Sequence, residues 1–296
     1  MSVPHDPVAA FEAERARVLG RQRLSSLAAL LIVSALLWGA VIISGVADQS
    51  LGSEPLARVA DFLDRLTPDL EADALLSDRD TRGSVASWWY DFPNWLAAAF
   101  ETLQIAILAT VFGGTLAAGL SMFAARNTMR FGAMRFAIRR LFEVLRTVPD
   151  IILAIILVAA FGVGPLAGVV ALTLSTTGSL GKLFTEANEN ADPRPIEAVR
   201  AVGGSWAMQL RYGLAPQISP DFASYALIRV ERNIAEAAAL GIVGAGGIGL
   251  ELERAISFTE FDTYLALLIL IIGMIFACDL ISSALRRRLI GEAAIP

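Results

Sequence analysis

Long apolar stretches are the feature of this sequence that most restricts its fold. A helix needs about 20 mostly apolar residues to cross the hydrocarbon core of a bilayer, and its backbone polar groups must all be paired within the segment. Stretches of this kind lie at residues 24–46, 94–124, 141–161, 164–182, 220–242 and 261–285. An apolar share of 55%, against about 45–50% in soluble proteins, supports the same conclusion. The sequence predicts an all-α, polytopic membrane protein with about six transmembrane helices.

The first apolar stretch follows a basic tail at residues 1–23, so a cleaved signal peptide is an alternative to a membrane anchor. The apolar core of a signal peptide is only about 7–15 residues long, and this stretch is longer. We therefore expect a first transmembrane helix at residues 24–46 that stays in the protein. An acidic segment at residues 47–93 and a transmembrane core at residues 94–290 follow it.

The distribution of basic residues predicts the orientation of the chain in the membrane. Lys and Arg are concentrated in the N-terminal tail and at residues 126–140, 182–211 and 286–288. The segment at residues 47–93 instead carries ten acidic residues against four arginines. Because basic loops stay in the cytoplasm, we expect both termini in the cytoplasm and the acidic segment outside. An even number of spans satisfies this arrangement.

Histidine and cysteine are too scarce for most catalytic or metal sites. His5 is the only histidine and Cys278 the only cysteine, which excludes disulfide frameworks, Cys/His zinc sites and histidine-based triads. We therefore expect no metal site and no catalytic residues on this chain, so that its function is binding and movement.

Two glycine-rich strings have features of nucleotide-binding motifs but lack the required context. GAGGIG at residues 244–249 has the spacing of the dinucleotide fingerprint, which needs a strand before it, whereas here an apolar helix precedes it. GSLGK at residues 178–182 lacks the glycine spacing of a P-loop and the Ser or Thr after its lysine. We expect no bound nucleotide or cofactor on this chain. We expect a tight, backbone-exposed re-entrant turn on the external side, formed by Gly244, Gly246, Gly247 and Gly249.

The longest basic connection is predicted to form short helices. Pro195 suits the first turn of a helix, and Glu197 then lies near the positive end of the helix dipole. Gly203 ends this helix, and a second helix at residues 205–211 closes before Pro216.

This connection resembles the signature of ABC importer permeases, in which EAA is followed after three residues by Gly and after nine more by I-x-L-P. The spacing is kept, although Val199, Gly213 and Ala215 depart from the signature. The resemblance implies a cytoplasmic coupling helix at about residues 195–207 that docks on a separate ATPase. The implied coupling residues are Glu197, Ala198, Arg200, Gly203 and Pro216. An ordinary amphipathic loop helix is the alternative.

The C-terminal half is similar to the phosphonate-type permeases. The matching stretches are RTVPD (146–150), FGVGPLAGV (161–169), TTGSLGKLFTEA (176–187), ENADPRPIEAVRA (189–201), RYGLAPQ (211–217) and LGIVGAGGIG (240–249). The resemblance implies a type I ABC importer permease fold in a bacterial inner membrane, and ATP-driven import of phosphonate, phosphite or phosphate.

The same resemblance implies a set of partners. They are membrane lipid, a second permease subunit that is identical or different, two ATP-binding subunits that bind ATP and Mg, and an extracytoplasmic substrate-binding protein. Nucleic acid is not among them. Import of another small solute such as methionine is an alternative, and a secondary transporter is a more distant one.

The predicted span at residues 220–242 carries charges that are costly inside a bilayer. A charged side chain at the bilayer centre costs about 2.5–3.5 kcal/mol, so such groups pair or line a wet cavity. Arg229, Arg232, Asn233 and Glu236 follow steps of three and four, which places them on one helix face, while Glu231 points elsewhere. We interpret this face as part of a translocation path for an anion. Snorkelling of the two arginines to the cytoplasmic end is the alternative.

Arg146 and Asp150 flank Pro149 in the predicted span at residues 141–161. Because proline kinks a helix, we expect either a gate or hinge at this point, or an Arg146–Asp150 pair that serves helix packing. Thr176 and Thr177, which begin one of the matching stretches, complete the expected path or gate. The small residues at 113–119 predict close helix packing.

Overall fold

The computed structural model describes residues 7–43 and 53–290, and every regular element within these ranges is helical. The chain divides into two compact units, residues 1–64 and 65–296. The first unit contains α1 (Pro7–Ile43) and most of α2 (Ser53–Leu66). Residues 17–43 of α1 are long and apolar enough to cross a membrane, in agreement with residues 24–43 of the predicted first transmembrane helix, whose last three residues lie outside the described ranges. Helix α2 lies in the acidic segment and was not predicted.

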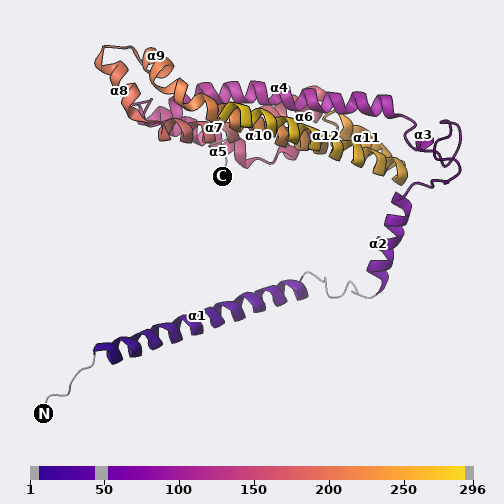
Figure 1. Ribbon diagram of the computed structural model, residues 1–296, viewed down its shortest axis with the longest axis horizontal. Helices are drawn as coiled ribbons and strands as arrows, with labels where there is room; N and C mark the ends of the chain where they lie inside the picture. Colours follow the sequence, from indigo (N-terminus) through magenta and orange to yellow (C-terminus); the bar gives the residue numbers. More distant parts are fainter. Residues whose placement is uncertain (1–6, 44–52, 291–296) are drawn as a thin grey trace. The chain divides into compact units, whose positions relative to one another are not determined.

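The second unit is a helical bundle. Helix α10 (Ala215–Gly241) contacts three other long helices, α4 (Phe92–Ala124), α7 (Pro165–Asn190) and α12 (Phe261–Ile290) (Figure 1). Two short helices, α3 (Val85–Trp88) and α11 (Ile248–Ser257), lie toward one end of the bundle. At the other end lie α8 (Pro193–Ala201), α9 (Trp206–Met208) and the π-helical turn η1 (Gln209–Leu214). Helices α5 (Gly132–Thr147) and α6 (Asp150–Phe161) pack against α7.

The predicted span at residues 141–161 is not a single helix. This stretch is divided between α5 and α6, whose axes are bent by 86°. Val148 is extended (φ −75°, ψ 123°), because the ring of Pro149 disfavours the helical conformation in the residue before it. Helix α5 therefore ends at Thr147, and a new helix begins at Asp150.

Helix α10 is the second departure from the predicted spans. It begins at Ala215 rather than Pro220, and its 27 residues give a length of roughly 40 Å, enough for a crossing. Because of its charged residues, however, α10 does not meet the criteria of length and composition for a membrane span. Four of the described helices meet them, and the number of spans is five if the bent pair of α5 and α6 is counted as one. The predicted total of six is reached only if the bent pair and α10 each cross the membrane.

Glycines allow two close helix contacts in the bundle. On α7, a methyl group at Gly181 would overlap the ring of Phe142 of α5, and one at Gly178 would lie 3.0 Å from the backbone oxygen of Phe142. On α4, a methyl group at Gly113 would lie 2.7 Å from Cβ of Thr176. The prediction of close packing at residues 113–119 is thus confirmed at Gly113. The GSLGK string lies inside α7, where its glycines serve this packing.

Candidate functional site

A buried polar network lies in the middle of the bundle and is built around Arg229 of α10. Its side chain is 7% exposed. The guanidinium donates to the hydroxyl of Ser175 at 3.0 Å, to the hydroxyl of Thr176 at 3.2 Å and to the carboxylate of Glu236 at 3.0 Å. Arg229 is therefore held by α7 and by its own helix. The alternative in which it snorkels to the cytoplasmic end is wrong.

Asn233, one turn further along α10, extends the network to α4. Its amide nitrogen donates to Oγ1 of Thr110 at 2.8 Å and to Oγ1 of Thr176 at 2.9 Å. Asn233 and Thr176 are fully buried. Because a buried polar group is costly unless it is hydrogen-bonded, these bonds fix α4, α7 and α10 to one another. Thr110 and Ser175 were not predicted from the sequence, although the presence of a polar residue within an otherwise apolar stretch was an available signal for Thr110.

Glu236 brings a fourth helix to the network. Its side chain is 29% exposed and lies within hydrogen-bonding reach of Asp150, in the first turn of α6. Asp150 therefore faces Glu236 and Arg229, not Arg146. Arg146 instead lines a separate cavity of about 190 Å³ between α5 and α7, together with Lys182 and other charged residues. The expected Arg146–Asp150 pair is absent from the described residues, since the bend at Pro149 separates the two side chains.

The remaining predicted path residues lie apart from this network. Arg232 is exposed on α10 and Glu231 is half-buried, so the four polar residues do not form a single stripe. Thr177 donates to the backbone oxygen of Thr173 at 2.7 Å and lies 3.4 Å from that of Gly113. These bonds place Thr177 at the contact between α7 and α4.

Helix α8 carries the predicted coupling residues. It begins at an N-cap, because the side chain of Asp192 accepts a hydrogen bond from the Arg194 amide at 3.0 Å. It ends at Ala201, and Gly203 lies directly after the C-cap as the predicted helix breaker, with a positive φ of 81° that suits glycine. Residues 195–207 are therefore not one helix, since α8 stops at Ala201 and α9 begins at Trp206.

Two contacts join α8 rigidly to the start of α10. The side chain of Gln217 donates to the backbone oxygen of Asp192 at 3.2 Å and accepts from its amide at 3.0 Å. Ile196 is buried against Leu214 and Ile218, while Glu197, Ala198 and Arg200 are exposed. Helix α8 thus presents an exposed face and is anchored through its other face.

The segment between α9 and α10 corrects a further prediction. The second short helix does not close before Pro216, because η1 continues directly into α10 and Pro216 lies in its first turn, where proline is tolerated. Gly213, which departs from the signature, permits close contact, since a methyl group there would lie 2.8 Å from Cα of Ile196.

The glycine turn lies at the opposite end of the bundle from α8. Gly244, Gly246 and Gly247 have φ between 72° and 91°, a region that favours glycine. Gly249 instead lies in α11. The expectation of an exposed backbone is wrong, because residues 244–249 are buried. The Gly164 amide donates to the Gly244 oxygen at 2.9 Å, and so the turn closes against the start of α7.

Groups of potential metal ligands are not found at these places. Within residues 7–43 and 53–290, no three His, Cys, Asp or Glu side chains lie close enough to hold a metal ion. The arrangement offers a rigid polar centre, an anchored helix at one end and a buried turn at the other. Such an arrangement can shelter charge within a membrane and transmit movement along α10.

Among known proteins, the chain is similar to permeases that are named for phosphite and for phosphate. The chain is 37% identical over 196 residues to the phosphite transport system permease protein PtxC of Stutzerimonas stutzeri, covering 66% of this chain and 71% of that protein. It is 39% identical over 193 residues to the phosphate-import permease protein PhnE of Mycolicibacterium smegmatis, covering 65% of this chain but only 36% of that protein.

Solved structures agree on the fold. A methionine ABC transporter chain in an inward-facing conformation matches with a TM-score of 0.58 at 19% identity, covering 66% of this chain and 95% of that chain. A chain of a bacterial alginate ABC transporter matches with a TM-score of 0.60 at 13% identity, covering 93% and 99%. At these identities the likeness concerns the fold alone, which is that of a type I ABC importer permease.

A family model places the chain among known proteins. It matches residues 117–291, a range that contains the network of α7 and α10 as well as α8, η1 and the glycine turn. Most of the bundle is thus covered by the match. The chain belongs to the family described as binding-protein-dependent transport system inner membrane components.

Proposed function

We propose that this chain is the transmembrane subunit of an ATP-driven importer of a phosphorus oxyanion, that is, phosphonate, phosphite or phosphate. The observation that carries the proposal is its identity of 37–39% with permeases named for phosphite and phosphate over about two thirds of this chain. The methionine alternative rests on a likeness of fold at 19% identity, and we therefore favour the oxyanion.

In this proposal α8 receives the force of a separate ATPase. Its exposed face carries Glu197 and Ala198, and its buried face is anchored through Ile196. Because Gln217 joins Asp192 to the first turn of α10, a displacement of α8 moves α10 with it. The polar network on α10 then shifts relative to α6, which carries Asp150. Closure of the ATPase dimer in this way opens the path to the external binding protein, and hydrolysis reverses the movement.

The translocation path runs along the face of α10 that this chain leaves uncovered. Ile228, Arg232, Ala235 and Ala239 are exposed there, and their spacing of four, three and four places them on one helix face. An arginine that faces hydrocarbon costs about 2.5–3.5 kcal/mol, so this face meets water or a second subunit. We therefore assign anion attraction to Arg232 and a structural role to Arg229.

The working assembly that we propose has two permeases, two ATP-binding subunits and an extracytoplasmic binding protein in a bacterial inner membrane, with both termini of this chain in the cytoplasm. The ATP and Mg sites belong to the ATPase partner.

A test of the proposal is ATP-driven uptake by proteoliposomes that contain the chain, its ATPase and its binding protein. We expect uptake of phosphate, phosphite or methylphosphonate that requires ATP. Reversing one charge on the docking face with Glu197→Lys should lower uptake and ATPase co-purification about tenfold, equivalent to about 1.4 kcal/mol.

Glu260→Lys is the matched control, because Glu260 is an exposed glutamate directly before α12. The first turn of α12 contacts Trp88 of α3, at the end of the bundle opposite α8. This variant should retain the ATPase. Full uptake by Glu197→Lys, or uptake driven by an ion gradient without the ATPase, would refute the proposal.

A further inference from the structure

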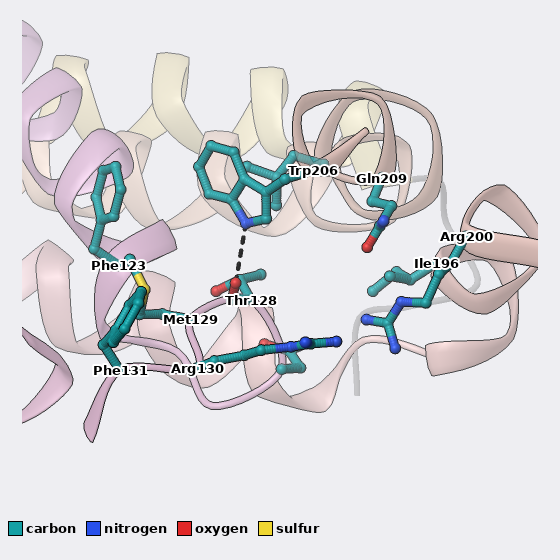
Figure 2. Close-up of a pocket in the computed structure, with 11 residues that line it drawn as sticks. Phe123, Thr128, Met129, Arg130, Phe131, Ile196, Arg200, Trp206 and Gln209 are labelled. Atoms are coloured by element: carbon teal, nitrogen blue, oxygen red, sulfur yellow. Dashed lines mark hydrogen bonds between the residues drawn. The ribbon is translucent and has the colours of Figure 1, made fainter. Parts of the chain in front are cut away.

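A cavity of about 470 Å³ lies beside α8 (Figure 2). It is lined by the connection between α4 and α5, which includes Arg130, and by α8, which includes Arg200, with α9 and η1 completing its wall. Its volume is within the range of about 300–1,000 Å³ that is typical of small-molecule sites.

The lining of this cavity includes two arginines and no acidic residue. Figure 2 shows the side chains of Arg130 and Arg200 directed toward each other across the opening. Neither arginine forms an ion pair with a carboxylate in the part of the chain that the structure describes. Two positive charges repel each other more strongly the closer they lie. An anion bound between the two guanidinium groups would offset this repulsion, so the arrangement favours an anion there. Arg139 of α5 and Arg229 of α10, by contrast, each form an ion pair, with Glu189 and Glu236 respectively.

The walls of the cavity are apolar and preformed. The indole nitrogen of Trp206 donates to the backbone oxygen of Thr128 at 2.9 Å, and its ring lies 5.7 Å from that of Phe123. Phe131 and Ile196 add further apolar surface. A site with two guanidinium groups and an apolar wall suits a ligand that combines a phosphate group with an apolar organic group.

We propose that this cavity binds a phosphate-bearing anion, held between the guanidinium groups of Arg130 and Arg200. Arginine suits this ligand because its planar fork matches phosphate oxygens in two parallel hydrogen bonds. The anion comes either from the headgroup of an anionic phospholipid or from free oxyanion in the aqueous phase. The proposal concerns binding by this chain and does not depend on what the chain transports.

Occupation of the site has a consequence for α8. Arg200 belongs to α8 and Arg130 to the connection after α4, so the bound anion bridges the two. It thereby restrains the helix that carries Glu197. By linkage, a ligand that binds one position of α8 more tightly stabilises that position. The side chain of Arg200 thus acts on coupling through the ligand.

The test uses the purified full chain in neutral detergent and in nanodiscs. One arm titrates inorganic phosphate, phosphite and methylphosphonate, and the other compares phosphatidylcholine nanodiscs with nanodiscs that contain phosphatidylglycerol. The ligand that fits should raise Tm by about 5–10 °C at about 100 times its Kd. A shift in the first arm identifies free oxyanion as the source, and a shift confined to the second identifies lipid.

Variants separate this site from any other anion site. Arg130→Gln and Arg200→Gln should each weaken binding at least tenfold, and the double variant should abolish the shift. Without ligand, each single variant should be at least as stable as the unmodified chain, because a repulsion is removed. Arg194→Gln is the matched control, since Arg194 is exposed on α8 but does not line the cavity.

Three results would overturn the proposal. The first is a Tm that no oxyanion or anionic lipid changes, and the second is a shift that persists in the double variant. The third is protection of Arg130 and Arg200 from chemical modification only when the ATPase is added, which would mean that an acidic protein segment occupies the cavity.

Discussion

Arg229 and the pair Arg130 and Arg200 place the same side chain in two opposite situations. Arg229 is buried and donates to Ser175, Thr176 and Glu236. Arg130 and Arg200 converge on a cavity and lack an acidic partner among the described residues. An arginine whose hydrogen bonds are already made is part of the framework, whereas one that is unpaired is available to a ligand. The sequence thus shows where an arginine stands, but only the groups around its side chain show whether it holds helices together or can bind a ligand.

Removal of the Arg229 side chain should have the largest effect on stability. In Arg229→Met, the carboxylate of Glu236 loses its partner next to Asp150 inside the bundle. The loss of one member of a buried ion pair costs about 3–5 kcal/mol, which denaturant unfolding in detergent would measure. The double variant Arg229→Met with Glu236→Met should recover part of the loss. Unchanged unfolding of Arg229→Met would mean that Arg229 is not part of the framework.

Asn233→Ala should have an intermediate effect. It removes the hydrogen bonds to Thr110 and Thr176 that join three helices. A hydrogen bond between membrane helices contributes on average about 0.6 kcal/mol in a folded bundle. Because the variant loses both bonds, we expect a loss of about 1–2 kcal/mol in the same unfolding experiment. Ala239→Ser on the exposed face is the control and should change stability little. A loss larger than that of Arg229→Met would show that the amide, not the ion pair, dominates the network.

Arg232→Gln should affect stability least. Arg232 is exposed on α10, and substitutions at exposed positions usually change stability by less than about 0.5 kcal/mol. If Arg232 attracts the anion, proteoliposome uptake should nevertheless fall about tenfold, or about 1.4 kcal/mol. Arg287→Gln, at an exposed position in the last turn of α12, should leave uptake unchanged. The opposite pattern, normal uptake with a marked loss of stability, would reverse the roles assigned to Arg229 and Arg232.

The long apolar helices were predictable from the sequence. Helices α4, α7 and α12 each contain a predicted span, because length and hydropathy suffice to define a crossing. The end of α8 just before Gly203 was predictable for a local reason, since a left-handed residue terminates a helix and glycine adopts this conformation readily.

The features that the sequence did not reveal depend on tertiary contacts. Steps of three and four placed Arg229 and Arg232 together, but one faces α7 and the other is uncovered. Periodicity does not show which neighbour covers which part of a face. Thr110 was missed because a single hydroxyl can bond its own helix, as it does to Ala106. The 86° bend at Pro149 exceeds what a kinked span was expected to show.

The close contact of Gly178 and Gly181 on α7 with Phe142 of α5 limits which parts of this bundle can move separately. Phe142 of α5 lies against Gly181 and Gly178 of α7, and from this close contact we infer that α5 and α7 move as one body. Val148 and Pro149 are the two residues between that body and α6. The ring of Pro149 fixes one of their four main torsions. Asp150 can therefore approach or leave α10 with very few degrees of freedom. A bulkier residue at position 181 would displace α5, and with it the Val148–Pro149 connection, without contacting Asp150 itself.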